Sequence, residues 1–222
     1  MNLSERVPEP ELMETVAQAR AYAAADFSEP HDAFVARFRE RFPEFRSGRV
    51  LDLGCGTADV TVRFARAYPD VRVDGIDGAP AMLDEGTQLV RTADLRDRVS
   101  LELVRLPSPS LNGAAYDAIV SNSLLHHLAE PGVLWDTVAS TARAGAPVFV
   151  MDLCRPASTE VAEHLVDTYA AGESPVLRDD FYRSLCAAYT PDEVIGQLGA
   201  AGLERFRAER AGDRHILIWG ES

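Results

Sequence analysis

The sequence has 222 residues and a formal net charge of −13 at pH 7, with 46% hydrophobic and 26% charged residues. This length suits one domain of ordinary size, and the composition excludes a disordered chain. The acidic excess disfavours a nucleic-acid partner, because binding to phosphates depends on Lys and Arg. No apolar run is long enough to span a membrane, and the first residues lack the order of a secretory signal, so we expect a cytoplasmic protein without a membrane partner.

Residues 1–47 have the pattern of a helical region that precedes the main domain. Apolar residues recur at helical spacing between residues 11 and 25, and Phe34, Phe38 and Phe42 repeat at every fourth position. Apolar residues at this period mark one face of a helix. We therefore expect residues 1–47 to form an N-terminal helical lid, with the aromatic stripe facing the core.

Strand-like and helix-like segments alternate from residue 48 onward. Short apolar strands are expected at residues 49–56, 71–77, 99–106, 116–123 and 146–153, with helices at 60–68, 79–93 and 131–145. This order is typical of βαβ units, and continuous apolar runs indicate strands that are buried on both faces of a mostly parallel sheet. The sequence thus predicts an α/β domain over residues 48–222.

Residues 156–190 interrupt this alternation with two helical patterns. We interpret them as an inserted helical cover over the site. The chain then returns to its earlier rhythm with a helix that Thr190 and Pro191 open, followed by two strands at residues 203–211 and 213–220.

The turn after the first strand carries the clearest functional signal. A strand, a glycine turn and a helix, with an acidic residue about 20 positions later, form the general plan of a nucleotide-binding unit. Here Gly54 and Gly56 are followed by Asp59 at the third glycine position of the dinucleotide motif, and Asp52 precedes the turn. Two carboxylates would repel a pyrophosphate but can attract the sulfonium and ammonium groups of S-adenosylmethionine. A nicotinamide oxidoreductase is therefore disfavoured.

The segments VLDLGCGTAD (50–59) and GIDGAPAML (75–83) resemble the first two motifs of class I S-adenosylmethionine-dependent methyltransferases. Residues 116–128 and 148–156 are similar to the family's fourth and fifth strands. The resemblance implies a Rossmann-like three-layer α/β sandwich with a seven-stranded sheet whose last strand runs antiparallel. Ala58, where the family usually has a glycine, departs from the pattern.

The resemblance also implies the residues that bind S-adenosylmethionine. Asp77 would accept from both ribose hydroxyls, Gly54 and Gly56 would line the methionine end, and Met82 would lie against the adenine. The acidic residue that often holds the adenine amino group is absent after the third strand, so the backbone of Arg105 or Leu106 is the expected partner. Further cofactor contacts are expected at Asp52, Gly78, Ser121 and Asn122.

Two adjacent histidines, His126 and His127, follow the fourth predicted strand. Ligands bind at this edge of open α/β sheets. Methyl transfer needs positioning, and it needs a base only if the attacking atom is protonated. Because neighbouring residues do not share a helical face, we expect His126 to face the methyl position as the base and His127 to pack, with a purely structural pair as the alternative. Substrate contacts are expected at Tyr22, Asp26, Phe27, Arg155 and Tyr182.

Several patterns are missing from the sequence. There is no Asn-Pro-Pro-Tyr segment, so nucleobase methylation loses support, and the three cysteines have neither zinc-site nor disulfide spacing. No metal-ligand cluster is evident, and we expect no metal. The predicted function is metal-independent transfer of methyl to an oxygen, nitrogen or carbon of a small-molecule acceptor, by a monomer or homodimer. The alternative is a protein that uses S-adenosylmethionine structurally or in another reaction.

Overall fold

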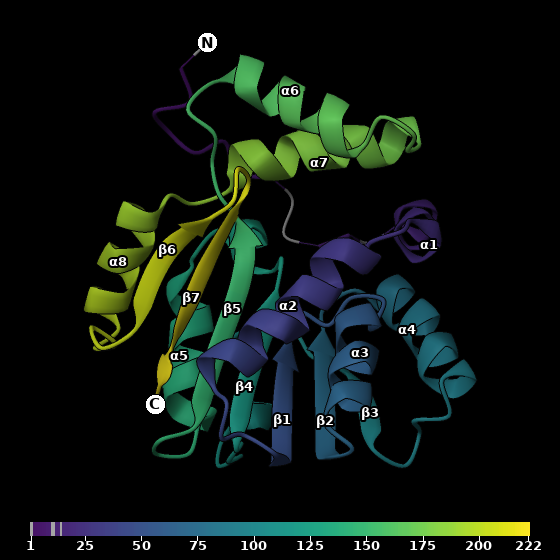
Figure 1. Cartoon of the computed structure of the whole chain (residues 1–222), viewed down its shortest axis with the longest axis vertical. Coiled ribbons are helices and arrows are strands. Elements are labelled where there is room, and N and C mark those ends of the chain that lie inside the picture. Colours follow the sequence, from purple (N-terminus) through teal and green to yellow (C-terminus); the bar gives the residue numbers. More distant parts are fainter. Residues whose placement is uncertain (1, 10–11, 14) are drawn as a thin grey trace.

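Seven strands form one sheet in the computed structural model, which describes residues 2–9, 12–13 and 15–222 (Figure 1). The strand order is β3-β2-β1-β4-β5-β7-β6. The strands are β1 (Ser47–Leu53), β2 (Asp70–Asp77), β3 (Val99–Leu103), β4 (Ala118–Asn122), β5 (Pro147–Leu153), β6 (Arg207–Ala211) and β7 (His215–Glu221). All seven predicted strands are present, although β3 ends three residues earlier than expected.

The sheet is mixed, which corrects the expectation of a mostly parallel sheet. Strands β1 to β5 pair in parallel, whereas β7 is antiparallel to both β5 and β6. Strands β6 and β7 run antiparallel because only a short connection joins Ala211 to His215, which are paired across the hairpin. A parallel return needs a much longer crossover. The antiparallel last strand that the family resemblance implies is confirmed.

The register of the parallel strands brings their carboxyl ends together. Leu53 at the end of β1 lies opposite Ile76 in β2 and Ser121 in β4. The residues that follow these positions in the three segments, Gly54, Asp77 and Asn122, therefore meet at one edge of the sheet. This edge is where ligands bind in open α/β sheets.

Helices cover both faces of the sheet. They are α1 (Val16–Ala24), α2 (Ser28–Arg41), α3 (Asp59–Ala67), α4 (Pro80–Thr92), α5 (Gly132–Thr141), α6 (Thr159–Tyr169), α7 (Pro175–Ala187) and α8 (Pro191–Ala200). One buried cluster joins the sheet to α2 and α3, and a second joins its other face to α5 and α8. Successive strand residues alternate between these clusters, as Val50 and Leu51 do, because side chains point to opposite faces of a strand.

The predicted N-terminal lid divides into two parts in the structure. Phe34 and Phe38 of α2 are fully buried and pack edge-on against Phe149 of β5, so α2 belongs to the core of the main domain. By contrast, α1 lies beside α4 and α7. Residues 2–9 run along the insertion, where the backbone N–H of Leu3 donates to Ala157 O.

The insertion forms two helices that lie across the carboxyl ends of the strands (Figure 1). Side-chain hydroxyls of Ser158 and Ser174 cap α6 and α7. The two helices pack together through a separate apolar cluster that includes Leu165 and Leu185. The following helix, α8, begins at Pro191 with Thr190 in a capping box, as its sequence predicts.

None of the helices in the described part of the chain is both long enough and apolar enough to cross a membrane.

Candidate active site

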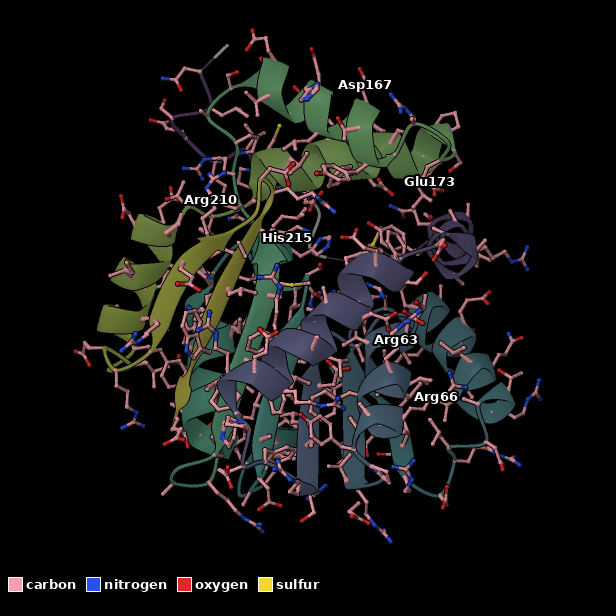
Figure 2. All side chains as sticks on the ribbon, viewed as in Figure 1. Arg63, Arg66, Asp167, Glu173, Arg210 and His215 are labelled. Carbon is pink, nitrogen blue, oxygen red and sulfur yellow. The ribbon has the colours of Figure 1, made fainter. Side chains whose placement is uncertain are left out.

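A cavity of about 350 Å³ lies between the strand ends, α1 and the inserted helices. Its volume falls within the usual range for small-molecule sites. Figure 2 places Glu173 at the loop between α6 and α7 and His215 at the start of β7, beneath α7, and both residues line the cavity. The cavity has a polar end formed by the glycine turn and a second end beneath the inserted helices.

The glycine turn presents its backbone to the cavity. Gly54 and Gly56 have φ angles of 71° and 53°, in the left-handed region that favours glycine. A Cβ atom on Gly54 would come within 2.9 Å of the Leu124 side chain. Ala58 adopts a φ of 62° and still closes the turn by donating its N–H to Cys55 O, so this departure from the family pattern is accommodated by strained backbone.

Asp77 lies at the end of β2 with its carboxylate fixed by the backbone. Its Oδ2 atom accepts from Gly56 N at 2.9 Å, and its Oδ1 atom accepts from Ala79 N at 2.8 Å. Burial raises the pKa of Asp77, although these backbone hydrogen bonds oppose the shift. Each carboxylate oxygen can accept a second hydrogen bond. Asp77 is therefore placed to hold two adjacent hydroxyl groups.

Asp52 is a second buried carboxyl group on the wall of the cavity. It is 1% exposed and accepts a hydrogen bond of 2.5 Å from the Thr61 hydroxyl. Burial raises the pKa of Asp52 to about 7; the Thr61 hydrogen bond opposes this shift and the nearby Asp77 adds to it. A cation in the cavity would favour the charged form of Asp52.

Asn122, at the end of β4, offers a buried acceptor to the cavity. Its Oδ1 atom has no hydrogen-bond partner among the residues that the structure describes. An unsatisfied buried acceptor is costly. The ammonium group of S-adenosylmethionine is a donor that would satisfy it, so Asn122, Asp52 and Asp77 fit this cofactor.

Most of the remaining cofactor predictions fall on the same wall. The lining includes Gly78, Met82, Arg105 and Leu106. Ser121 does not lie there, which corrects the prediction: it is fully buried, and its hydroxyl donates to Leu53 O at 2.8 Å, linking β4 to β1.

The negative charge of Asp59 is offset by two neighbouring side chains, His31 and Arg63, which the sequence pattern did not reveal. Its Oδ2 atom lies 2.6 Å from His31 Nδ1 and 2.7 Å from Arg63 Nε. Arg63, labelled in Figure 2, also pairs with Asp32 of α2. Repulsion of a pyrophosphate at this turn therefore rests on Asp52 and Asp77 rather than on Asp59.

His126, which lines the cavity, is held by a buried carboxylate. Its Nδ1 atom lies 2.5 Å from Asp152 Oδ1, and the Asp152 carboxylate also accepts from the backbone N–H groups of Leu125 and Leu153. Burial lowers the pKa of His126, but the Asp152 charge and hydrogen bond outweigh it, with Glu9 adding to them, so the pKa is raised. The Nε2 atom of His126 is left to face Glu9.

His127, the second catalytic candidate of the sequence, also lines the cavity and faces the same corner as His126. Both histidines lie in η2 (Leu125–His127), a single 3₁₀ turn, and their ring centroids are 4.2 Å apart. Glu9 Oε1 lies 3.3 Å from His127 Nδ1 and 3.5 Å from His126 Nε2, and it accepts from the Ser184 hydroxyl at 3.0 Å. Burial raises the pKa of Glu9, although His126 opposes the shift.

Sequence reasoning missed Glu9 and Asp152. The sequence does signal Asp152, because it is a single acidic residue in the otherwise apolar strand VFVMDL. Glu9 has no such signal. Together, Glu9, His126 and His127 form a group that could hold a metal ion. The sequence shows no metal-ligand cluster because the carboxylate of this group comes from a distant segment, and the expectation of no metal stays a prediction.

The predicted substrate contacts divide into two groups. Tyr22, Asp26 and Phe27 line the cavity. Arg155 and Tyr182 are not on its wall, which corrects both predictions. Arg155 is buried and holds the chain together, donating to Leu3 O, to Ala188 O and to the Glu193 carboxylate, whereas Tyr182 packs against the apolar cluster of the inserted helices.

The acceptor end also contains residues that the predictions did not include. The added lining residues are Met151, Leu153, Tyr169, Ala170, Glu173, Leu177, Phe181, Arg214 and His215. Burial lowers the pKa of His215 to about 4, with the nearby Arg214 adding to the shift, so this imidazole is neutral at neutral pH. The guanidinium of Arg214 lies 3.3 Å from the centroid of the Tyr169 ring.

Comparison with known proteins agrees with this geometry. Residues 51–148 match the model of a methyltransferase domain. An uncharacterized methyltransferase of Mycobacterium bovis is 25% identical over 149 residues, which are 67% of this chain and 73% of that protein. The ubiquinone/menaquinone biosynthesis C-methyltransferase of Geotalea daltonii is 23% identical, covering 75% and 69% of the two chains. The 27-O-demethylrifamycin SV methyltransferase of Amycolatopsis mediterranei is 27% identical, covering 84% and 65%.

Solved structures share the fold. A methyltransferase from Aquifex aeolicus that depends on S-adenosylmethionine has a TM-score of 0.69 at 16% identity, covering 93% of this chain and 98% of that chain. The plantazolicin methyltransferase BpumL, solved with S-adenosylhomocysteine and a triazolic desmethylPZN analogue, has a TM-score of 0.68 at 13% identity, covering 93% and 89%. The methyltransferase-domain match over residues 51–148, the sequence motifs and the shared fold together support a class I S-adenosylmethionine-dependent methyltransferase.

Proposed function

We propose that this enzyme transfers the methyl group of S-adenosylmethionine to an oxygen, nitrogen or carbon atom of a small-molecule acceptor, with no metal taking part in the chemical step. The observation that carries this proposal is the histidine–carboxylate pair of His126 and Asp152, with His126 on the wall of the same cavity as the glycine turn. A protein that held the cofactor only for structure would have no use for a buried base there. The similarity to a ubiquinone/menaquinone biosynthesis C-methyltransferase and to a 27-O-demethylrifamycin SV methyltransferase also supports a small acceptor.

The lining of the acceptor end supports a largely apolar acceptor. Met151, Leu153, Leu177 and Phe181 contribute apolar side chains. The charged lining residues at this end include Glu173 and Arg214. An acceptor with an apolar body and one polar reactive group would match this distribution. The acidic net charge of the chain supports the same conclusion, because it disfavours nucleic acid as the acceptor.

The cofactor, when bound, supplies a methyl group on a cationic sulfur that an attacking atom can displace in line. The protein would position the two reactants: Asp77 would hold the ribose hydroxyls, Asn122 and Asp52 would hold the ammonium group, and the glycine turn would allow close approach. His126 takes the proton of the acceptor at Nε2. Asp152 accepts from Nδ1–H of His126, fixes the tautomer and stabilises the imidazolium.

The segments over the cavity are proposed to open for the acceptor. The sequence assigns residues 1–47 to a lid and residues 156–190 to a cover on a methyltransferase domain of residues 48–222. We narrow the mobile part to α1, α6 and α7, because α2 is fixed in the core by Phe34 and Phe38. The N-terminal residues would follow α7, since the backbone N–H of Val7 donates to Cys186 O.

An acceptor panel tests the proposal. The purified chain is incubated with S-adenosylmethionine and small phenols, amines, carboxylic acids and quinols, and S-adenosylhomocysteine is quantified together with the methylated product by mass spectrometry. Turnover with at least one acceptor, lost in His126→Asn and retained in His164→Asn on the exposed face of α6, is expected. Tight cofactor binding without turnover across the panel would favour the rival structural role.

A further inference from the structure

The corner where the N-terminal segment meets η2 has the geometry of a transition-metal site. One ligand atom each from Glu9, His126 and His127 lies within 4.8 Å of the others. Glu9 Oε1 is 3.5 Å from His126 Nε2 and 3.3 Å from His127 Nδ1. Zinc bonds of about 2.0–2.1 Å at tetrahedral angles place ligand atoms about 3.3–3.4 Å apart. The two separations therefore match those around a tetrahedral zinc ion.

The ligand atoms are also oriented correctly. His126 uses Nδ1 to contact Asp152, which leaves the lone pair of Nε2 directed at Glu9. A carboxylate behind a ligating histidine is a recurrent feature of metal sites, because it fixes the ring and raises its basicity. Glu9 is held in the same way by the Ser184 hydroxyl. Three side chains that are only 3%, 13% and 8% exposed, those of His126, His127 and Glu9, are thus preorganised.

The charge around the corner favours a dication. Glu9 and Asp152 supply two carboxylates in direct contact with the histidines, and Asp180 lies close enough to influence Glu9. The opposing charge is Arg6, whose guanidinium donates to His126 O and Ala187 O. Two imidazoles and one carboxylate suit zinc, whereas magnesium prefers oxygen ligands alone.

We propose that Glu9, His126 and His127 form a zinc site with one coordination position directed into the acceptor end of the cavity, which both histidines line. The site also has a regulatory consequence, and this part rests on the proposed function. Zinc takes the Nε2 lone pair of His126 that proton transfer requires. Zinc binding and catalysis by His126 are therefore mutually exclusive, and zinc inhibits the enzyme.

Binding is measured first, on the full chain after treatment with EDTA. Calorimetry with Zn²⁺ should give one ion per chain, Co²⁺ should give the visible absorption of tetrahedral coordination, and Mg²⁺ should not bind. Glu9→Gln and His127→Asn should each weaken zinc binding by more than the 10- to 100-fold that loss of a supporting partner costs. His164→Asn, which removes an exposed imidazole, is the matched control and should change nothing.

Equal zinc affinity in wild type and Glu9→Gln would overturn the site, as would an affinity that falls equally in His164→Asn. These measurements need no acceptor, so their outcome does not depend on the proposed function.

Inhibition is then tested with an acceptor from the panel: zinc should abolish turnover of the wild type at saturating occupancy, EDTA should restore it, and Glu9→Gln should resist the same zinc concentration. Full turnover of the zinc-loaded wild type would overturn the inhibitory role.

Discussion

The two ends of the cavity are built in different ways. The cofactor end uses residues that directly follow three neighbouring strands, and much of its surface is backbone held by the glycine turn. The acceptor end joins Glu9, His126 and Asp152, which come from the N-terminal segment, η2 and β5. A short motif can encode the first end, whereas the second depends on long-range packing. Substitutions at the cofactor end should therefore alter cofactor affinity, and those at the acceptor end should alter turnover.

The largest effect is expected at the cofactor end. Asp77→Ala should weaken S-adenosylmethionine binding by about 2 to 4 kcal/mol, or roughly 30- to 700-fold in Kd, because two charge-assisted hydrogen bonds to the ribose are lost. Calorimetry measures the change directly. Asp74→Ala on the same strand is the control, since Asp74 pairs with Arg49 and Ser100 outside the cavity. An unchanged Kd in folded Asp77→Ala would mean that the cofactor lies elsewhere.

The next effect separates the acceptor end from the cofactor end. His126→Asn in metal-free buffer should lower kcat by roughly 100-fold, because proton removal from the acceptor loses its base, while cofactor affinity stays within a few-fold. The measurement compares kcat and S-adenosylhomocysteine binding for the variant and for His164→Asn. If His126→Asn turns over at the wild-type rate, positioning alone suffices and the acceptor needs no base.

The contrast between the two ends of the cavity also explains which site residues could be predicted from the sequence. Gly54, Gly56 and Asp77 were predictable because the turn and the end of the next strand are local features of a recurring motif. Ser121 was misplaced because alternation along β4 turns its side chain away from the cavity. The partners of His126 were missed for a different reason: pairing between η2, β5 and the N-terminal segment is a tertiary contact that no sequence spacing reveals.

The insertion illustrates the same limit. Its helices were predictable from their periodicity, but the functions of its flanking polar residues were not. Arg155 is a cationic residue of the kind that often binds a ligand. In the structure, however, its guanidinium donates to three backbone carbonyls and to the Glu193 carboxylate. A long cationic side chain beside a predicted site can serve equally to tie separate segments together, and only the fold distinguishes the two uses.

A smaller effect should appear in the pH dependence of cofactor binding. The pKa of Asp52 is raised to about 7, so the carboxyl loses its charge as the pH falls through that value. The ammonium group of the cofactor binds better to the charged form. The Kd should therefore rise by up to about ten-fold per pH unit below 7 in wild type, and Asp52→Asn should remove this dependence. Calorimetry between about pH 5.5 and 8.5, roughly 1.5 pH units on each side of the Asp52 pKa, measures the Kd of the wild type and of the variant.

The stability of the free protein provides the control for Asp52. A carboxyl group with a raised pKa contributes stability that is present at low pH and is lost as the pH rises through its folded pKa. Asp52→Asn, which can still accept from Thr61, should therefore unfold at a higher temperature than wild type at pH 8, and by a smaller margin at pH 5, because the loss accumulates between the unfolded pKa and the folded pKa of about 7. Equal unfolding temperatures at pH 8 would show that burial of Asp52 carries little cost.

The smallest effect, a change in hydrogen exchange, tests whether the acceptor end is also the mobile end. The backbone amides of α1, α6 and α7 should exchange faster than those of the sheet in the free protein and slow down by several-fold when S-adenosylhomocysteine and an acceptor bind together, because closure buries them. The internal reference is α2, which the sequence assigned to the same lid but which Phe34 and Phe38 fix in the core; its exchange should not change. S-adenosylhomocysteine alone should protect the glycine turn and the end of β2 and leave α7 nearly unaffected. Equal protection of α7 in free and doubly bound protein would mean that the cover is permanently closed. A slowing confined to α1 would instead limit the lid to that single helix.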